Sequence, residues 1–160
     1  MKVTIFSSNQ PRHLNIAKEF SKICDSVFLV SEVNTVFPGQ VNDFYKKSEI
    51  MQTYFQNVIQ SERNIFGDIS FMPHNVRNLS IKSGDLNKLS RKQLSDALQS
   101  DVYVVFGASY IKGWLIDFCK LNRLKLINSY CELALLEDIN KEKVIFTTKT
   151  KSNFEGTVFY

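Results

Sequence analysis

The opening of the chain has the polarity pattern of a buried strand followed by a helix. Lys2 to Ser7 is predicted to be a strand, because Val3, Ile5 and Phe6 are bulky and the segment contains no turn former. Ser8-Asn9-Gln10-Pro11 predicts a helix start, because proline is favoured in a first helical turn. The apolar stripe of Ile16, Phe20 and Ile23 predicts the helix, and Ser26 to Val30 predicts a second strand. A strand, helix and strand in this order indicate parallel strands joined by a right-handed crossover.

The middle of the chain predicts a long helix, an irregular stretch and a third strand. Phe37-Pro38-Gly39 breaks the first pattern, and a helix is expected from Asn42 with Glu62 and Arg63 near its end. Residues 67–78 have no clear period and predict irregular chain, followed by a short strand over Leu79 to Lys82. Ser90 and Gln93 have capping-box spacing, so a further helix is expected with Leu94, Ala97 and Leu98 on its buried side.

Residues 101–106 (DVYVVF) are nearly all apolar, which suits a strand covered on both faces. Gly107-Ala108-Ser109 predicts a turn, Trp114 to Phe118 a helix, and Leu124 to Asn128 a strand. In the remaining chain, 133–136 is compatible with a helix. Residues 144–148 and 157–160 are compatible with a hairpin. Together these elements predict an α/β fold with a parallel, Rossmann-like sheet and helices on both faces.

Composition fits one globular domain. The chain has 160 residues, of which 44% are hydrophobic and 22% charged. Its apolar runs are shorter than the roughly 18 residues that cross a bilayer. The first ten residues lack the apolar centre of a signal peptide, so no membrane partner is expected. Three cysteines without metal-type spacing indicate reduced thiols and a cytoplasmic location.

The net charge of +4 comes from 20 basic and 16 acidic residues that are scattered along the chain. Nucleic-acid binding normally needs a clearer basic patch with aromatic residues among the charges, so no nucleic-acid partner is expected. His13 and His74 are 61 positions apart without acidic or cysteine partners at ligand spacing, so no metal site is expected. Both are interpreted as surface histidines, His13 with a possible capping role. Ser109 lies in Gly-Ala-Ser, which is not a hydrolase nucleophile motif.

In an open parallel sheet, ligands bind beyond the carboxyl ends of the strands. The expected strand ends are 7–10, 31–32, 106–110 and 128–130, all of them short polar or glycine-containing segments. The first of these has neither a Gly-x-Gly-x-x-Gly pattern nor a phosphate-loop lysine. Ordinary dinucleotide or ATP binding is therefore disfavoured.

The run VVFGASYIKGWLIDF, followed about ten residues later by LIN, resembles the folate-dependent formyltransferases. These enzymes include methionyl-tRNA formyltransferase, glycinamide ribonucleotide formyltransferase and amino-sugar N-formyltransferases. The resemblance covers residues 1–128 and is closest over 102–128. It implies a formyltransferase-like α/β domain over 1–128 that takes 10-formyltetrahydrofolate as formyl donor and an amine, such as an amino sugar, as acceptor.

By this resemblance, Asn128 matches the asparagine that holds the formyl oxygen. The loop that receives the pterin through its backbone matches Phe106, Gly107, Ala108, Ser109, Tyr110 and Ile111. Tyr130 stands at the position of the catalytic histidine. Tyrosine has a pKa of about 10 and does not exchange protons readily near pH 7, so formyl transfer by this chain is expected to be impaired.

The likeness stops within two residues of Asn128, and residues 131–160 contain no proline. The segment 129–160 is therefore interpreted as a divergent tail that replaces the family's own continuation, as a frameshift would do. Two short strands in it would leave an open sheet edge, which favours pairing into a homodimer. One alternative function is a non-catalytic ligand-binding or interaction module on the same fold. Another is a nucleotide-sugar glycosyltransferase domain, although the Asp-x-Asp motif is missing.

Overall fold

The computed structural model describes residues 1–42, 46–121, 125–128, 144–150 and 154–157. The expected helix at 133–136 and Tyr130 lie outside the described residues. No helix within the described ranges is long and apolar enough to cross a membrane.

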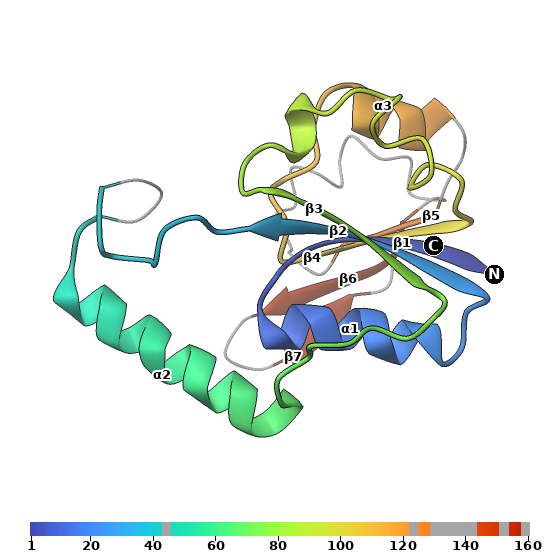
Figure 1. Ribbon diagram of the computed structural model, residues 1–160. Coiled ribbons are helices and arrows are strands. Elements are labelled where there is room, and N and C mark those ends of the chain that lie inside the picture. Colours follow the sequence, from blue (N-terminus) through green and yellow to red (C-terminus); the bar gives the residue numbers. More distant parts are fainter. Residues whose placement is uncertain (43–45, 122–124, 129–143, 151–153, 158–160) are drawn as a thin grey trace.

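One seven-stranded sheet forms the centre of the molecule (Figure 1). Its order is β3-β2-β1-β4-β5-β6-β7, with the first six strands parallel and β7 antiparallel to β6. The chain starts in the middle, adds strands on one side, and then crosses to the other, so the direction of winding switches between β1 and β4. The strands are β1 (Lys2–Ser8), β2 (Ser26–Val33), β3 (Val76–Lys82), β4 (Val102–Phe106), β5 (Lys125–Asn128), β6 (Val144–Thr150) and β7 (Phe154–Thr157).

Helices cover both faces of the sheet. In Figure 1, α1 (Pro11–Ser21) and α2 (Glu49–Phe66) lie on one side, and α3 (Trp114–Leu121) lies on the other. A short 3-10 helix, η1 (Leu86–Lys88), lies on the α3 side. The predicted fold class, a parallel Rossmann-like α/β sheet with helices on both faces, is confirmed.

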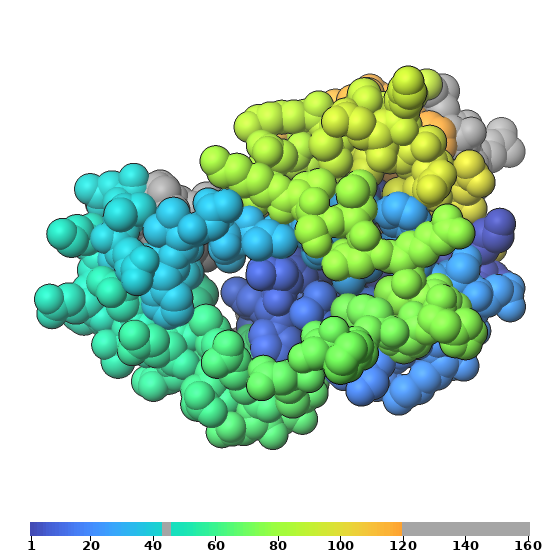
Figure 2. Space-filling model, viewed as in Figure 1, coloured from blue at the N-terminus to red at the C-terminus, as the bar shows by residue number. Residues whose placement is uncertain are grey.

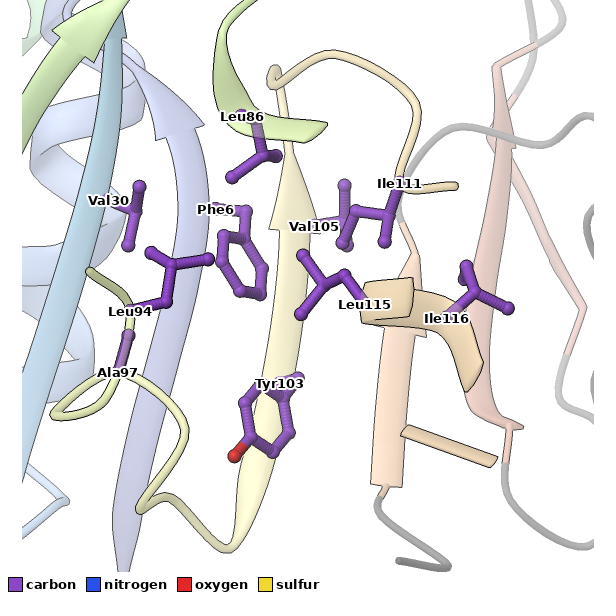
Figure 3. Packing of buried hydrophobic residues seen from close by; sticks show 10 residues of the cluster. All are labelled: Phe6, Val30, Leu86, Leu94, Ala97, Tyr103, Val105, Ile111, Leu115 and Ile116. Atoms are coloured by element: carbon purple, nitrogen blue, oxygen red, sulfur yellow. The ribbon is translucent and has the colours of Figure 1, made fainter. Parts of the chain in front are cut away.

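The core has two halves because alternate residues of each strand point to opposite faces. On the α1 side, Ile5, Leu29 and Val104 pack with Ala17 of the helix. On the α3 side, Phe6, Tyr103 and Leu115 belong to a second cluster, which Figure 3 shows gathered over β1 and β4. β1 and β4 are buried on both faces; β4 is accordingly almost continuously apolar, whereas β1 also buries the hydroxyl residues Thr4, Ser7 and Ser8.

Several predicted boundaries agree with the structure within a few residues. Gln10 is the N-cap of α1 and Pro11 its first residue, as the sequence indicates. β2 runs three residues further than expected, and β3 begins at Val76 instead of Leu79, inside the stretch predicted to be irregular. The hairpin expected in the tail is present, but its second strand is Phe154–Thr157 and not 157–160.

The long helix begins at Glu49 and not at Asn42, which corrects the prediction. Gly39, at φ +84°, turns the chain, and its carbonyl accepts bonds from the Ser48 N–H (2.9 Å) and Gln52 Nε2 (3.0 Å). Ser48 then caps the helix by accepting a bond from the Met51 N–H at 3.3 Å. This cap, seven residues into the expected helix, fixes where α2 starts.

The segment 91–98 is a run of turns and not the predicted helix. Its capping box does form, since the Ser90 N–H donates to Gln93 Oε1 (2.8 Å) and the Gln93 N–H donates to Ser90 Oγ (3.3 Å). The backbone bonds that follow mix three- and four-residue spacing, as in Ser95 to Lys92 and Leu98 to Leu94. Leu94 and Ala97 are nevertheless buried, so the packing was predicted correctly and the backbone conformation was not.

Candidate functional site

The four segments expected to form a site end parallel neighbouring strands, so they share one edge of the sheet. β1 ends at Ser8, β2 at Val33, β4 at Phe106 and β5 at Asn128. Asn128 pairs in register with Val105 of β4, which brings its backbone one strand away from the start of the 106–111 loop. The structure therefore brings together the positions that the resemblance assigns to the formyl group and to the pterin.

The loop Phe106–Ile111 is held in place by residues distant in sequence. Gly107 has φ +77°, a backbone conformation that favours glycine. At the other end of the loop, the side chain of Ile111 is buried in the core. The side chain of Asn87 clamps the loop: its Nδ2 donates to the Tyr110 carbonyl (2.7 Å), and its Oδ1 accepts from the Lys112 N–H (2.8 Å). The loop is thus fixed before any ligand arrives.

A buried carboxylate lies next to this loop, in the strand-end segment 31–32, although the sequence did not predict its burial. Glu32 is 3% exposed. Its Oε2 accepts from the Ser109 N–H at 2.6 Å, and its Oε1 accepts from the Gly84 N–H at 2.9 Å and the Leu86 N–H at 3.4 Å. We call Glu32 with these three amides the Glu32 junction. Converging backbone N–H groups of this kind bind phosphate in other proteins. Here the carboxylate of Glu32 occupies them.

His13 corrects the expectation of a surface residue, because it is 2% exposed beneath the 106–107 turn. Its ring packs edge-on against Phe106 (centroids 4.9 Å apart), and a Cβ atom at Gly107 would overlap it. Nε2 accepts from Arg12 Nε at 3.0 Å, so the proton of the neutral ring belongs on Nδ1, which then donates to Ser8 Oγ.

This arrangement does not activate Ser8 as a nucleophile. A general base must accept the serine proton, whereas Nδ1 here donates to the serine oxygen. Burial, and then the neighbouring Arg12 charge, lowers the pKa of His13 to about 3, so the ring is neutral near pH 7. Ser8 and His13 therefore tie β1 to α1 and to the 106–107 turn.

The N-terminus of α1, where a phosphate would be expected in a nucleotide fold, is also filled from within. Glu62 of α2 is 7% exposed and forms an ion pair with the Arg12 guanidinium. Its Oε2 also accepts from the Arg12 N–H at 3.5 Å. Pro11 has no N–H to offer. We call the pair of Glu62 and Arg12 the Glu62 contact. A carboxylate at this helix end leaves no room for a phosphate, and the first loop likewise has no phosphate-binding motif.

A 10-formyl folate fits this edge in part. The register of Asn128 with Val105 brings the Asn128 backbone next to the strand that leads into the turn at Gly107, as the resemblance implies. The N–H of Ser109 and the carbonyl of Tyr110 are already bonded to Glu32 and Asn87, so they would bind a pterin only by giving up these partners. Neither of the two cavities described, of about 470 and 370 Å³, is lined by the 106–111 loop.

The remaining candidates have ordinary surroundings. His74 is exposed, as predicted, at the amino end of the sheet. Asp85 forms an ion pair with Lys88 at 2.7 Å, which holds the pKa of its carboxyl below the usual value. Cys24 and Cys119 are buried free thiols, and burial raises the pKa of Cys119 to about 11.

Comparison of the chain with models of protein families, with curated protein sequences and with solved structures found no match.

Proposed function

We propose that this chain is a formyltransferase-like domain whose site lies at the carboxyl ends of β4 and β5. Its ligand is a 10-formyl folate together with an amine acceptor of the amino-sugar kind. The observation that carries the proposal is the register of Val105 with Asn128, which sets the asparagine beside the loop Phe106–Ile111. This is the neighbourhood that the sequence resemblance requires.

In this proposal, Asn128 supplies a side-chain N–H that stabilises the negative oxygen formed when an amine attacks the formyl carbon. Removing such a donor typically costs about 3 kcal/mol of transition-state stabilisation. The bound folate supplies the activated formyl group. The 106–111 loop, held by Asn87 and by the Glu32 junction, orients it through backbone groups, of which the Ser109 N–H and the Tyr110 carbonyl must first exchange their present partners.

Tyr130 limits the rate. The acceptor amine must lose a proton during transfer, and a phenol with a pKa of about 10 exchanges protons poorly near pH 7. Loss of a proton-transfer group costs a factor of about 10² to 10⁴ in rate. The chain as it stands is therefore proposed to bind the folate weakly and to transfer its formyl group slowly or not at all.

A second candidate is a non-catalytic binding or interaction module on the same fold. The bonds that Ser109 and Tyr110 already make favour it, because they leave fewer loop groups for a pterin. The two candidates differ in one respect: the first requires that Asn128 and position 130 affect chemistry, and the second does not.

The decisive experiment combines calorimetry with a stable 10-formyl folate analogue and a turnover assay on amino sugars. We expect weak binding for the native chain, weaker binding for Asn128→Ala, and turnover far below about 1 s⁻¹. Tyr130→His should raise the rate, while the matched control Tyr130→Phe should not. Native turnover of about 1 s⁻¹ would contradict the role given to Tyr130. Absence of folate binding in all variants would favour the non-catalytic module.

A further inference from the structure

A cavity separate from the proposed formyl site opens between α1 and α2. Its volume of about 470 Å³ lies within the range of roughly 300–1,000 Å³ that is common for small-molecule sites. Figure 2 shows the hollow between the teal atoms of α2 and the green atoms that follow, with blue atoms of the N-terminal segment at its floor. None of its lining residues belongs to the 106–111 loop, so it is a separate candidate site.

The walls divide into an apolar and a polar part. The polar part contains amides and hydroxyls, which suit a ligand with several hydroxyl groups: Asn9, Asn34, Thr35 and Ser70. The apolar part suits a flat ring: Leu14, Val36, Phe37, Phe55, Ile59 and Ile69. Apolar and polar residues line the cavity in similar numbers, so it offers both a surface on which a ring can pack and groups that can orient a ligand.

Gln10, which lines the cavity, carries the clearest sign of a missing partner. Its Oε1 is buried and has no hydrogen-bond partner. A buried acceptor without a donor costs free energy, and such groups are rare in native proteins. The terminal torsion of glutamine is broad, so the amide of this cavity-lining residue can rotate to meet a donor. A ligand that offers an N–H there would satisfy it.

The charges around the cavity favour a neutral ligand. Pro11 has no N–H, and the Arg12 N–H faces Glu62, so the N-terminus of α1 is already occupied. The guanidinium of Arg63, at the cavity wall, faces Asp68, with Arg63 Nε 3.6 Å from Asp68 Oδ1. Each of these positive groups is thus paired with a carboxylate, which an anionic ligand would have to displace.

We propose that this cavity binds a neutral nucleoside-like molecule. A ring N–H of the base donates to Gln10 Oε1, the base packs on Phe37, Phe55 and Ile59, and the sugar hydroxyls meet the polar part of the wall. Nucleoside binding here does not require folate binding or Asn128, so it can be tested independently of the proposed formyl transfer.

The test is an NMR titration of the full chain, observed through its backbone amides, with three probes: uridine, 3-methyluridine and uridine 5′-monophosphate. Uridine should cause saturable shifts at residues 9–14 and 55–63 with a Kd below about 10 mM. 3-Methyluridine, which lacks the ring N–H, should bind about tenfold more weakly. The monophosphate should bind no more tightly than uridine.

Two variants and a matched control complete the test. Gln10→Leu removes the orphaned acceptor and should weaken uridine binding about tenfold without lowering stability, while Gln56→Leu, at an exposed position of α2, should change neither. Ile59→Trp should fill the cavity and abolish binding. Equal binding of uridine and 3-methyluridine, tighter binding of the monophosphate, or shifts confined to residues 106–111 would each overturn the proposal.

Discussion

The Glu32 junction and the Glu62 contact are two buried carboxylates that hold the same edge of the sheet in different ways. Glu32 accepts from backbone amides of loops 52 to 77 residues away, and these donors have little freedom to move. Glu62 relies on Arg12, a long side chain that is 36% exposed. Both carboxylates are thus buried, but only Glu32 accepts its hydrogen bonds from rigid backbone donors. We therefore expect the Glu32 junction to contribute more to the free energy of unfolding than the Glu62 contact.

The largest effect is expected from Glu32→Ala, which leaves the amides of Gly84, Leu86 and Ser109 without their acceptor. Hydrogen bonds to a charged group contribute about 1.5–3 kcal/mol each, and part of the loss is recovered by water, so we expect a loss of about 3 kcal/mol in the free energy of unfolding. Urea denaturation measures it. Glu32→Gln keeps one oxygen and should lose about half as much. A loss below about 1 kcal/mol for Glu32→Ala would contradict the comparison.

Gly107→Ala tests the turn that lies between the Glu32 junction and the His13 ring of α1. The new methyl group would overlap the His13 ring, and alanine is strained at φ +77°, so we expect a loss of about 2 kcal/mol. Gly113→Ala is the control, since it has φ +63° but no atom within 4 Å of the added carbon. It should lose only about 1 kcal/mol. Equal losses would show that the contact with His13 costs nothing.

Acid should lower the free energy of unfolding, because His13 is buried in its neutral form. Its folded pKa of about 3 lies below the unfolded value of about 6.5, so the unfolded chain binds more protons between these two values. The contribution of His13 is complete above about pH 6.5 and is lost as the pH falls toward 3. Between about pH 7.5 and 5.5 this amounts to roughly 1.4 kcal/mol.

Chemical denaturation at both pH values measures this loss. His13→Gln should remove this pH dependence, and His74→Gln, at an exposed position, should keep it. An unchanged pH dependence in His13→Gln would assign the acid sensitivity to other groups.

The smallest effect is expected at the Glu62 contact. A double-mutant cycle of Glu62→Gln and Arg12→Met should give a coupling of about 1 kcal/mol, because the exposed arginine weakens the pair through solvent screening. Urea denaturation of the four chains gives the value. A coupling larger than the loss in Glu32→Ala would reverse the ranking of the two carboxylates.

Much of the fold was predictable from local signals. β4 is continuously apolar because both its faces are covered, the bulky residues Val3, Ile5 and Phe6 mark β1, and Pro11 marks the start of α1. The start of α2 was not predictable from periodicity, because Gly39 and Ser48 decide it through a turn and a cap. The segment 91–98 has a helical pattern of buried residues, yet its backbone bonds vary in spacing.

The sequence predicted the location of the candidate site but not the contacts of the residues around it. The rule for parallel sheets located the edge, and the register of Asn128 agrees with it. The sequence places Glu32 in one of the four strand-end segments and Glu62 near the end of the long helix, but it predicts the burial of neither. Their hydrogen-bond partners are 50 or more positions away, and nothing local marks a carboxylate for burial. His13 was assigned to the surface for the same reason: Gly107, which covers it, comes 94 residues later.

The composition of α2 has a consequence for how the molecule moves. Among the 18 residues of this helix only Glu62 is buried, so little apolar area holds the helix to the rest of the chain. Segments with few buried contacts detach at a lower free energy than the global unfolding of the core. In native-state hydrogen exchange, the amides of α2 should therefore exchange through a sub-global opening, while those of β1 and β4 wait for the whole domain. We thus expect α2 to behave as a separate cooperative unit, while α1 on the same face opens with the core.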